Sequence, residues 1–504
     1  MVIVCVDGGL PNTVSTWNFF SPHRRFPDAP DSGAVPLRSV FPSSTAPAHA
    51  SFLTGVPPAD HGIVGNRFWD GESVAEIRER AADPIRTIHP YEARSLTAPS
   101  LIDWLTGQGA SVEAIHFPHT FSRGEAVSTP ALYCLYAPAR EVRLGLRGAL
   151  RESVAPVTYF DREVPLRVRS CKQANDAVVL GWGHDDETFV TLKEGETART
   201  SFRIDAGPLS VPITCLTAGP DDVRLRLGTA VLTMRFGGMP THSGAADGPS
   251  SLAVEYTAAS DHNFHESPRA EWIRDAALKT LADDDPDVLL VRFNQADHAQ
   301  EYLYWYAARG EGRTAASARQ QILDTYQRID HCVDGILSAA GPETDYIIFS
   351  DHGIDYVEDH LRPNAVLRDL GLGERMVFQG DSNVAYLYAD TRPEDAVLDT
   401  VYARLRSLDP SIDRIDADAA TELGLPWGSV RLGRLAVTCG AHREFHYDAD
   451  GAATEKVRSA SHGHLPATPS MYGFFRMFGP HTAHAPVPSH ICEVFETVRQ
   501  VWLG

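Results

Sequence analysis

Three aspartates in the sequence each follow a run of apolar residues. Asp7 comes after VIVCV, Asp351 comes directly after TDYIIFS, and Asp297 stands a short distance beyond DVLLVRF. Continuous apolar runs of this kind are typical of parallel strands buried on both faces, and open α/β sheets place their ligands at the carboxyl ends of such strands. We therefore expect the three carboxylates to converge on one edge of a parallel sheet.

A histidine beside one of these carboxylates adds a second kind of ligand. His352 follows Asp351 directly. Carboxylate oxygen together with imidazole nitrogen suits Zn²⁺, Mn²⁺ or iron, so the predicted edge has the donors of a metal site. The chain has 21 histidines, and any one of them taken alone is more often structural or exposed than a ligand. The ordered set of residues, rather than a single histidine, predicts the metal site.

A hydroxyl group stands at the start of a predicted helix. Thr45 precedes Ala46 and Pro47, and an apolar helical pattern continues to Gly55. Because proline is preferred in the first turn of a helix, Thr45 is expected at or beside the N-cap, where unpaired N–H groups and the helix dipole favour an anion. An ordinary threonine cap explains this position equally well, so the position alone does not identify a nucleophile.

These residues occur within an ordered series of short motifs. The chain contains the first Asp, then TAPAH, HGIVGN, an Asp-x-x-x-ligand motif, Asp-His-Gly and finally His-Gly. In this order it resembles the alkaline phosphatase superfamily, and most closely the type I phosphodiesterase/nucleotide pyrophosphatase branch, which also includes phosphonoacetate hydrolase. The segment from Thr45 to Asn66 carries the resemblance most specifically. The resemblance covers residues 1–123 and about 287–504, and does not extend to the segment between them.

The resemblance implies a role for each motif residue. Thr45 would be the nucleophile, and Asn66 with the backbone N–H of Ala46 would hold a non-bridging oxygen of the transferred group. Seven side chains would bind two divalent metal ions: Asp7, Thr45, Asp351 and His352 at the first, and Asp297, Glu301 and His462 at the second. A metal lowers the pKa of a hydroxyl nucleophile, and two ions about 4 Å apart can clamp the attacking and leaving oxygens.

One implied ligand departs from the family pattern. The family has histidine four residues after the aspartate, whereas this chain has Glu301 four residues after Asp297. Glutamate can bind zinc, and an added carboxylate favours a harder ion, so Zn²⁺ is expected first and Mn²⁺ is the alternative. His298 could replace Glu301 as the ligand if this segment is a loop rather than a helix turn. A weak or missing second metal is a further alternative.

Other histidines lie close to the motifs. His462 fits the His-Gly motif, so His464 is expected to line the pocket or to be exposed. His442 and His446 are four residues apart and could form a separate metal site, although a polar surface is the simpler interpretation. His49 is expected to be structural, because a metal-activated hydroxyl requires no general base.

The elements between the motifs predict an α/β fold. Helical patterns over residues 101–105, 268–281 and 314–339 lie between the apolar strands. Alternation of strands and helices indicates a mainly parallel central sheet flanked by helices. The resemblance implies that this sheet belongs to an alkaline-phosphatase-like sandwich.

A segment of different character interrupts this alternation. From about Val154 to Phe236 the sequence has short alternating runs separated by Gly, Pro and Asp, which predict an all-β insert. We therefore expect a catalytic core in two parts, residues 1–150 and 246–504, with a β-rich insert over residues 151–245 that caps the active site or mediates contacts.

Composition limits the partners of the protein. Its 504 residues include 45 Lys and Arg and 66 Asp and Glu, so the net charge is −21. This charge argues against a protein that binds a nucleic acid polymer or an anionic membrane, since both require a basic face, and no apolar run of about 18 residues predicts a membrane-spanning helix. The lack of a signal-peptide pattern and the seven scattered cysteines predict reduced thiols and a cytoplasmic location. Bound metal ions could attract a small anionic, phosphate-containing substrate such as a nucleotide.

These observations predict a metal-dependent hydrolase of phosphodiester or pyrophosphate bonds that forms a covalent phospho-threonine intermediate. A C–P hydrolase similar to phosphonoacetate hydrolase is an alternative, with Arg140, Arg143 and Arg147 as candidates for binding a substrate carboxylate. A phosphoryl or sulfuryl transferase on the same fold is another. The alternative from a different class is a non-catalytic protein that binds a nucleotide or phosphate, and the absence of one expected histidine supports it.

Overall fold

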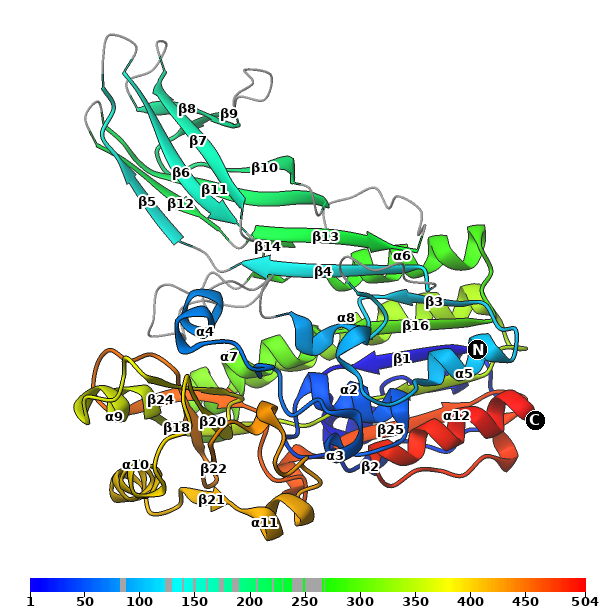
Figure 1. The fold of residues 1–504 in the computed structure, drawn as a ribbon. Helices are drawn as coiled ribbons and strands as arrows, with labels where there is room; N and C mark the ends of the chain where they lie inside the picture. Colours follow the sequence, from blue (N-terminus) through cyan, green and yellow to red (C-terminus); the bar gives the residue numbers. More distant parts are fainter. Residues whose placement is uncertain are drawn as a thin grey trace.

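The structure is a computed structural model that describes most of the chain. The described residues are 1–81, 88–122, 129–137, 140–147, 151–159, 162–171, 176–183, 190–204, 207–219, 222–228, 230–237, 248–249, 265–266 and 268–504. Figure 1 shows a lower body that contains both termini and a projecting part above it that is built of strands.

A large mixed sheet runs through the body. Its middle strands are parallel neighbours, in the order β17 (Tyr346–Phe349), β1 (Val2–Val6), β16 (Val288–Phe293), β3 (Val112–Ile115) and β4 (Ala131–Ala137). Beyond β17, two strands continue the sheet in antiparallel orientation: β25 (Gly473–Phe478) and β2 (Val35–Leu37). The predicted α/β fold with a mainly parallel central sheet is confirmed, and β1 spans the residues predicted for it.

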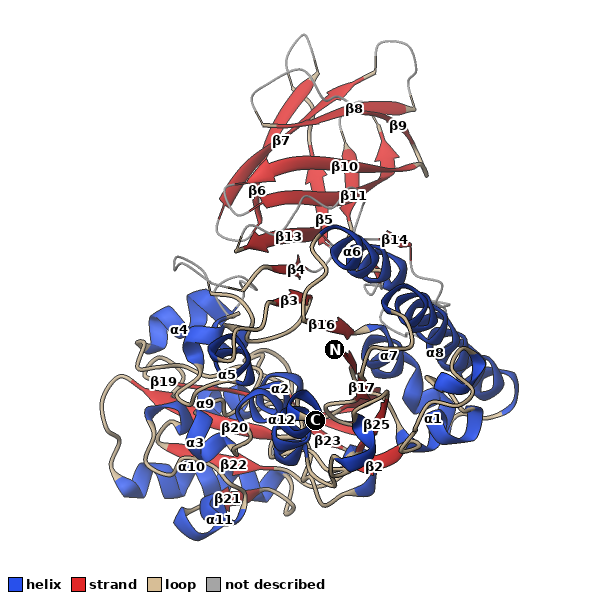
Figure 2. Cartoon of the chain, turned by 90° about the vertical axis from the view of Figure 1, so that its right-hand side faces the viewer, coloured by secondary structure: helices blue, strands red, loops and turns tan. Residues whose placement is uncertain are grey.

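The side chains of β1 explain why helices cover both faces of this sheet. Successive strand residues point to opposite faces. Val4 and its alternate neighbours pack in one apolar cluster, and Ile3 and Cys5 pack in another. The helices of the first cluster are α6 (Ala270–Asp283), α7 (Gln295–Arg309) and α8 (Gly312–Ala340). Those of the second are α2 (Thr45–Thr54), α5 (Leu101–Gly107) and α12 (Val494–Leu503). Figure 2 shows these two layers on either side of the strands.

The strands between residues 140 and 236, here called the β region, form the projecting part. Antiparallel strands extend the large sheet beyond β4: β13 (Ala230–Phe236), β11 (Gly207–Ala218), β12 (Val223–Leu227) and β5 (Arg140–Leu144), with β10 (Thr197–Ile204) beside β11. A second sheet contains β6 (Glu152–Tyr159), β7 (Arg162–Ser170), β8 (Ala177–Trp182) and β9 (Val190–Lys193). The two share one apolar core. The predicted boundary at 245/246 lies outside the described residues, as does residue 150, and β5 stands before residue 151.

Two small sheets complete the body beside the site. One contains β19 (Met376–Gly380), β20 (Val384–Ala389), β22 (Leu435–Thr438) and β21 (Asp413–Ile415). The other contains β23 (Arg443–Phe445), β18 (Asp355–Leu361) and β24 (Thr454–Ser461). The remaining longer elements are α1 (Pro11–Trp17), α3 (Pro58–His61), α4 (Val74–Ala81), α9 (Pro363–Asp369), α10 (Asp395–Leu408) and α11 (Ala417–Glu422). None of the described helices is long and apolar enough to cross a membrane.

Candidate active site

The carboxylates predicted to meet do meet at the ends of the parallel strands. Val6 of β1 is paired with Phe293 of β16, and Cys5 with Phe349 of β17, so Asp7, Asp297 and Asp351 leave neighbouring strands at the same edge. Gly8 permits the closest approach. Its φ is +67°, and a Cβ on Gly8 would lie 2.9 Å from the Cα of Asp297. A side chain there would push the carboxylates apart.

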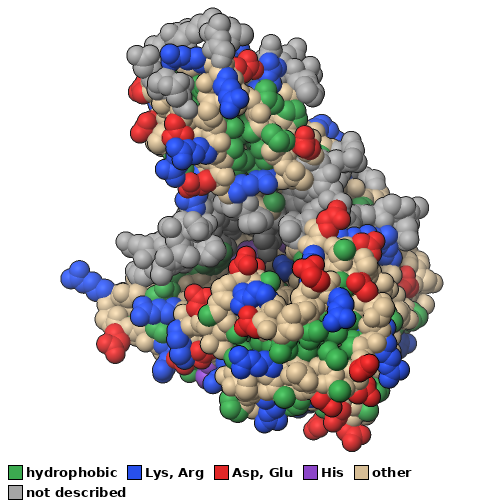
Figure 3. Space-filling view, turned by 60° about the vertical axis from the view of Figure 1, so that its left-hand side comes forward, with side chains coloured by type: hydrophobic (Ala, Val, Ile, Leu, Met, Phe, Trp, Pro, Cys, Tyr) green, Lys and Arg blue, Asp and Glu red, His purple; other side chains and the backbone are tan. Residues whose placement is uncertain are grey.

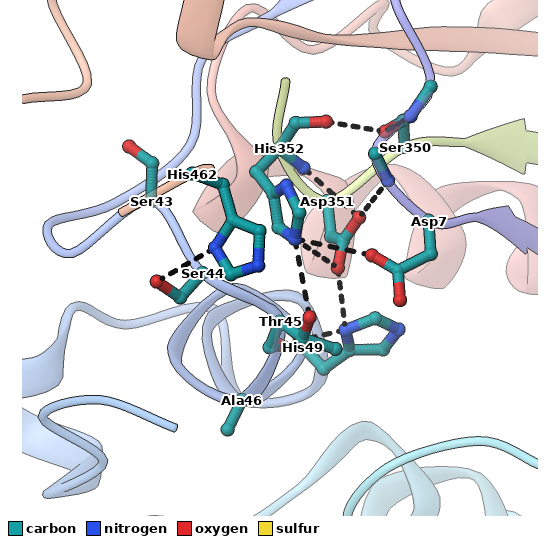
Figure 4. Close-up of polar contacts among 12 residues, drawn as sticks. Asp7, Ser43, Ser44, Thr45, Ala46, His49, Ser350, Asp351, His352 and His462 are labelled. Atoms are coloured by element: carbon teal, nitrogen blue, oxygen red, sulfur yellow. Dashed lines mark hydrogen bonds and ion pairs between the residues drawn. The ribbon is translucent and has the colours of Figure 1, made fainter. Parts of the chain in front are cut away.

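His352 occupies the centre of this cluster (Figure 4). Its Nε2 lies 3.2 Å from Asp7 Oδ1, 3.6 Å from Asp351 Oδ2 and 3.2 Å from Thr45 Oγ1. Its other ring nitrogen, Nδ1, lies 2.9 Å from the carbonyl oxygen of Gly353. A hydrogen bond from Nδ1–H to a backbone carbonyl leaves Nε2 as the atom available to a metal, an arrangement typical of metal-binding histidines.

Thr45 is the first residue of α2, and Ser44 is its N-cap. The Thr45 side chain is buried, with its hydroxyl directed at His352. Proline at position 47 stands in the first turn, where the missing N–H costs no hydrogen bond. The expectation that Thr45 lies beside the N-cap is therefore confirmed, and the hydroxyl lies at the positive end of the helix dipole.

Asn66 is held against the same helix terminus. Its Oδ1 accepts a hydrogen bond of 2.8 Å from the N–H of Ala46, and its own backbone N–H donates to Asp381 Oδ2 at 3.0 Å. The N–H of Ala46 is therefore engaged by Asn66 in this structure, and the Asn66 Nδ2 group is the donor left to face a ligand.

The residues expected at a second metal come together only in part. Asp297, His352 and His462 place ligand atoms within 4.8 Å of one another. Glu301 lines the adjoining cavity, with Oε1 3.9 Å from His462 Nε2. Residue 298 lies in the first turn of α7 and also lines this cavity, so the helix does not turn the His298 side chain away from the site.

Buried oxygens without partners test whether these residues fit a cation. Among the described residues, Asp297 Oδ1 accepts no hydrogen bond. Asp7 Oδ1 and Asp351 Oδ2 are also buried, and the donors nearest to them are imidazole nitrogens at 3.2 and 3.3 Å. Buried carboxylates without donors are costly unless a cation is present, so this donor set fits divalent metal ions.

The pKa values show how strongly the cluster requires positive charge. Burial, followed by repulsion from Asp7, raises the pKa of Asp297 to about 8. Burial opposes protonation of His352, yet Asp351 and Asp7 raise its pKa to about 10. For Glu301, burial and then Asp297 raise the pKa well above its usual value. A cation at this edge would relieve the repulsion that causes these shifts.

Arg292 is a buried residue of this edge that the sequence analysis missed. Its Nε donates to Asp7 Oδ2 at 2.9 Å, and its Nη2 contacts the same oxygen. The guanidinium and His352 hold the pKa of Asp7 well below its usual value, although burial acts in the opposite direction. The available signal was an arginine near the end of the apolar run VLLVRF, where it is the only charged residue. Asp381, which holds Asn66, belongs to no motif and had no comparable signal.

A cavity of about 700 Å³ opens beside the cluster. Among its lining residues are Asn66, Arg67, His116, Tyr133, Arg292, Glu301 and His462. On the face shown in Figure 3, the surface is hollowed between the β region and the body, and acidic and basic side chains lie near the hollow. We call the cavity of about 700 Å³ that these residues line the main cavity.

Comparisons with known proteins assign the chain to a family. The family model described as type I phosphodiesterase / nucleotide pyrophosphatase matches residues 1–463. The chain belongs to this family. No curated protein matched the sequence.

Solved structures of this fold cover nearly the whole chain. Murine ectonucleotide pyrophosphatase/phosphodiesterase 5, as an inactive variant in complex with AMP, is 12% identical, with a TM-score of 0.54 and coverage of 99% of this chain and 94% of that chain. The human protein of the same name is 14% identical, with a TM-score of 0.53 and coverage of 99% and 93%. Phosphonoacetate hydrolase from Sinorhizobium meliloti has a TM-score of 0.48 at 14% identity, with coverage of 99% and 95%. At these identities the murine and human structures show that the chain has the family's fold.

The other sequence candidates lie outside the cluster or support it. Of the arginines considered for a substrate carboxylate, Arg140 packs 4.4 Å from the centre of the Tyr159 ring and Arg143 pairs with Asp222 at 2.6 Å. Neither these two nor Arg147 is among the described residues that line the main cavity. The described structure therefore gives them no place in the lining of this site.

Four histidines in and around the motifs have separate surroundings. His442 stacks on Tyr356 and His446 stacks on His360, and neither belongs to a group of three potential metal ligands among the described residues. His464 is buried and does not line the main cavity. His49 is also buried, and its Nδ1 lies 2.9 Å from the Thr45 carbonyl and 3.3 Å from Asp351 Oδ2.

Proposed function

We propose that the protein hydrolyses phosphodiester or pyrophosphate bonds of small anionic substrates and that Thr45 is its nucleophile. Membership of the type I phosphodiesterase / nucleotide pyrophosphatase family supports phosphoester hydrolysis. The observation that carries the finer proposal is the buried Thr45 hydroxyl, which lies at a helix N-terminus and 3.2 Å from His352 Nε2. Because Ser44 and not Thr45 is the N-cap, capping does not account for the position of this hydroxyl.

In the proposed reaction, Thr45 Oγ1 forms a bond to phosphorus as the bond from phosphorus to the leaving oxygen breaks. The Thr45 hydroxyl gives up its proton to solvent, the leaving oxygen takes one up, and the rest of the substrate stays on Thr45 as a phosphate ester. Water then attacks phosphorus from the side opposite the Thr45 oxygen and loses a proton, the bond from phosphorus to Oγ1 breaks, and Oγ1 takes up a proton, which restores the hydroxyl. Two successive displacements at one centre replace a single difficult hydrolysis with two easier steps.

The metal ions would be held by two groups of residues. Asp7, Thr45, Asp351 and His352 would hold one, and Asp297 and His462 with Glu301 would hold the other. When bound, divalent ions lower the pKa of a hydroxyl and of water and offset charge on the reacting oxygens. We propose Zn²⁺ as the first candidate, because carboxylate oxygen together with imidazole nitrogen suits it. Mn²⁺ is the alternative, because Glu301 adds oxygen donors where the family has histidine nitrogen.

Two residues would stabilise negative charge in addition to the metal ions. The Nδ2 group of Asn66 would donate to a non-bridging phosphate oxygen, since its Oδ1 is fixed by the N–H of Ala46. Arg292 would hold Asp7 Oδ2, which directs Asp7 Oδ1 towards His352 and the cluster. Neither residue needs to move a proton in this scheme.

The first experiment combines metal analysis with two substrates. The purified protein is analysed for metal and then assayed with bis(p-nitrophenyl) phosphate and p-nitrophenyl phosphate, with and without added Zn²⁺ or Mn²⁺. We expect two ions per chain and faster cleavage of the diester than of the monoester. Less than one tight ion per chain and no turnover of either substrate would contradict the proposed function and favour a binding protein.

A further inference from the structure

A second cavity adjoins the main cavity. Its volume is about 570 Å³, and we call it the side cavity. Four residues line both cavities: Arg67, Ala81, Tyr447 and Asp448. These shared lining residues place the two cavities side by side, with Arg67 at their junction.

Arg67 stands at this junction and directly follows Asn66 in the chain. Its side chain is exposed, and it forms no hydrogen bond or ion pair with another residue in the part of the chain that the structure describes. A guanidinium has five N–H donors in a planar fork that matches the oxygens of a phosphate or a carboxylate. The unused donors of Arg67 are therefore available to an anionic group that occupies the junction.

The charge around the side cavity also favours an anion. Arg78 pairs with Glu374 at 3.9 Å, and the Glu374 side chain is 98% exposed, so solvent screens that pair strongly. Arg368 is committed to Asp369 and to the carbonyls of Ala449 and Gly451. Arg368 therefore adds positive charge to the side cavity, but its N–H donors are already engaged by these partners.

The acidic residues of the side cavity repel a bound anion only weakly. They are Glu374 and Asp448, and the Asp448 side chain is 70% exposed and lies 3.2 Å from His446. In addition, Gln379 is buried, and its Oε1 accepts no hydrogen bond from the described residues. A hydroxyl or amide of a bound ligand could donate to that oxygen.

We propose that Arg67, supported by the charge of Arg78, binds a second anionic group of the substrate at the junction of the two cavities. The group is a phosphate or a carboxylate on the substrate arm that extends away from the reacting phosphorus. This inference rests on the proposed function, because it assigns a specificity to the same reaction. It narrows the substrate class to phosphodiesters or pyrophosphates that carry a separate anionic end.

The test uses three p-nitrophenyl phosphodiesters with the same leaving group. Their second alcohol is n-butanol, 4-hydroxybutanoate or the monophosphate of 1,4-butanediol, so that the arm is uncharged, a carboxylate or a phosphate. The variants are Arg67→Gln and Arg67→Lys, and the control is Arg404→Gln, which removes an exposed arginine of α10 that lines neither cavity. The measured quantity is the ratio of kcat/KM for each anionic arm to kcat/KM for the uncharged arm.

We expect the wild-type protein to prefer an anionic arm and Arg67→Gln to lower that preference about tenfold, mainly through KM. Arg67→Lys should lose part of the preference, because lysine keeps the charge without the fork, and Arg404→Gln should keep all of it. The arm with the larger loss identifies phosphate or carboxylate as the group bound. Hydrolysis of all three esters without a preference that depends on Arg67 would overturn this inference and leave the proposed function intact. Hydrolysis of none by the metal-loaded protein would overturn both.

Discussion

Charged residues are held in opposite ways in the catalytic edge and in the β region. At the edge, Asp7, Asp297 and Asp351 are buried, and one carboxylate oxygen of each has no donor among the described residues other than histidine. In the described part of the β region the ionic pairs are partly or largely exposed, as between Arg143 and Asp222, whose side chains are 76% and 45% exposed. The core of the β region is formed by aliphatic and aromatic side chains.

This difference separates residues that serve chemistry from residues that serve stability. Buried like charges oppose folding, so the edge is tolerated only with a compensating cation, with Arg292 as a permanent one. The surface pairs of the β region are exposed to solvent and contribute little in either direction. Substitutions of similar chemistry should therefore have very different effects in the two places.

The largest effect is expected from Thr45→Ala. Loss of the nucleophile should lower kcat for bis(p-nitrophenyl) phosphate by about three orders of magnitude or more, while metal content stays nearly intact. The control is Thr54→Ala at the end of the same helix, where the hydroxyl donates to the Ala50 carbonyl and accepts from the N–H of Val56, away from the cluster. Turnover retained by Thr45→Ala would contradict the covalent mechanism.

A large loss of stability is expected from Arg292→Met. The substitution leaves Asp7 buried without its guanidinium, which should cost about 3 kcal/mol in the free energy of unfolding of the metal-free protein. Thermal denaturation with and without added Zn²⁺ measures this, and the metal should reduce the loss, since a bound cation also compensates Asp7. An equal loss in both conditions would mean that Arg292 and the metal do not act on the same charge.

A moderate effect that depends on pH is expected from Glu113→Gln, in β3 between the two regions. Burial, followed by repulsion from Asp284, raises the pKa of Glu113 to about 7. The folded protein thus keeps a proton that the unfolded chain loses at lower pH, so stability falls as pH rises from about 4.5 to 7. The variant should be about 1 kcal/mol more stable at pH 8 and equal to wild type below about pH 4.5.

Denaturant unfolding at pH 8 and at a pH below about 4.5 checks this prediction. Glu422→Gln, at an exposed position of α11, is the matched control and should have no effect at either pH. A stabilisation by Glu113→Gln that is the same at both pH values would show that the buried charge is not its cause.

The smallest effect is expected from Arg224→Gln in the β region. Arg224 Nη2 lies 2.9 Å from Glu141 Oε2, and both side chains are about half exposed. Loss of this pair should change the free energy of unfolding by less than about 1 kcal/mol and leave turnover unaltered. A loss as large as that of Arg292→Met would remove the distinction between the two regions.

The sequence predicted the features that local pattern controls. β1, the start of α2 at Thr45 and the convergence of Asp7 and Asp351 followed from apolar runs and from helix-capping preferences. The site residues that depend on distant loops could not be predicted in this way. Asp381 reaches Asn66 from a loop 315 positions away, and Arg67 has significance only because two cavities meet beside it.

Glu301 shows a different limit. The sequence identified it by its spacing from Asp297, and α7 does place the two on one side of the helix. The distance of 3.9 Å between Glu301 Oε1 and His462 Nε2, however, depends on how β24, which ends just before His462, packs against α7. Its role as a metal ligand stays a prediction, as does the cytoplasmic location.

The stereochemical course at phosphorus tests the central claim most directly. A diester made chiral at phosphorus with one sulfur substitution is hydrolysed in isotopically labelled water, and the configuration of the product is determined. Attack by Thr45 followed by attack of water inverts the centre twice, so the account predicts net retention. Net inversion would mean that water attacks the substrate directly, and it would contradict Thr45 as the nucleophile.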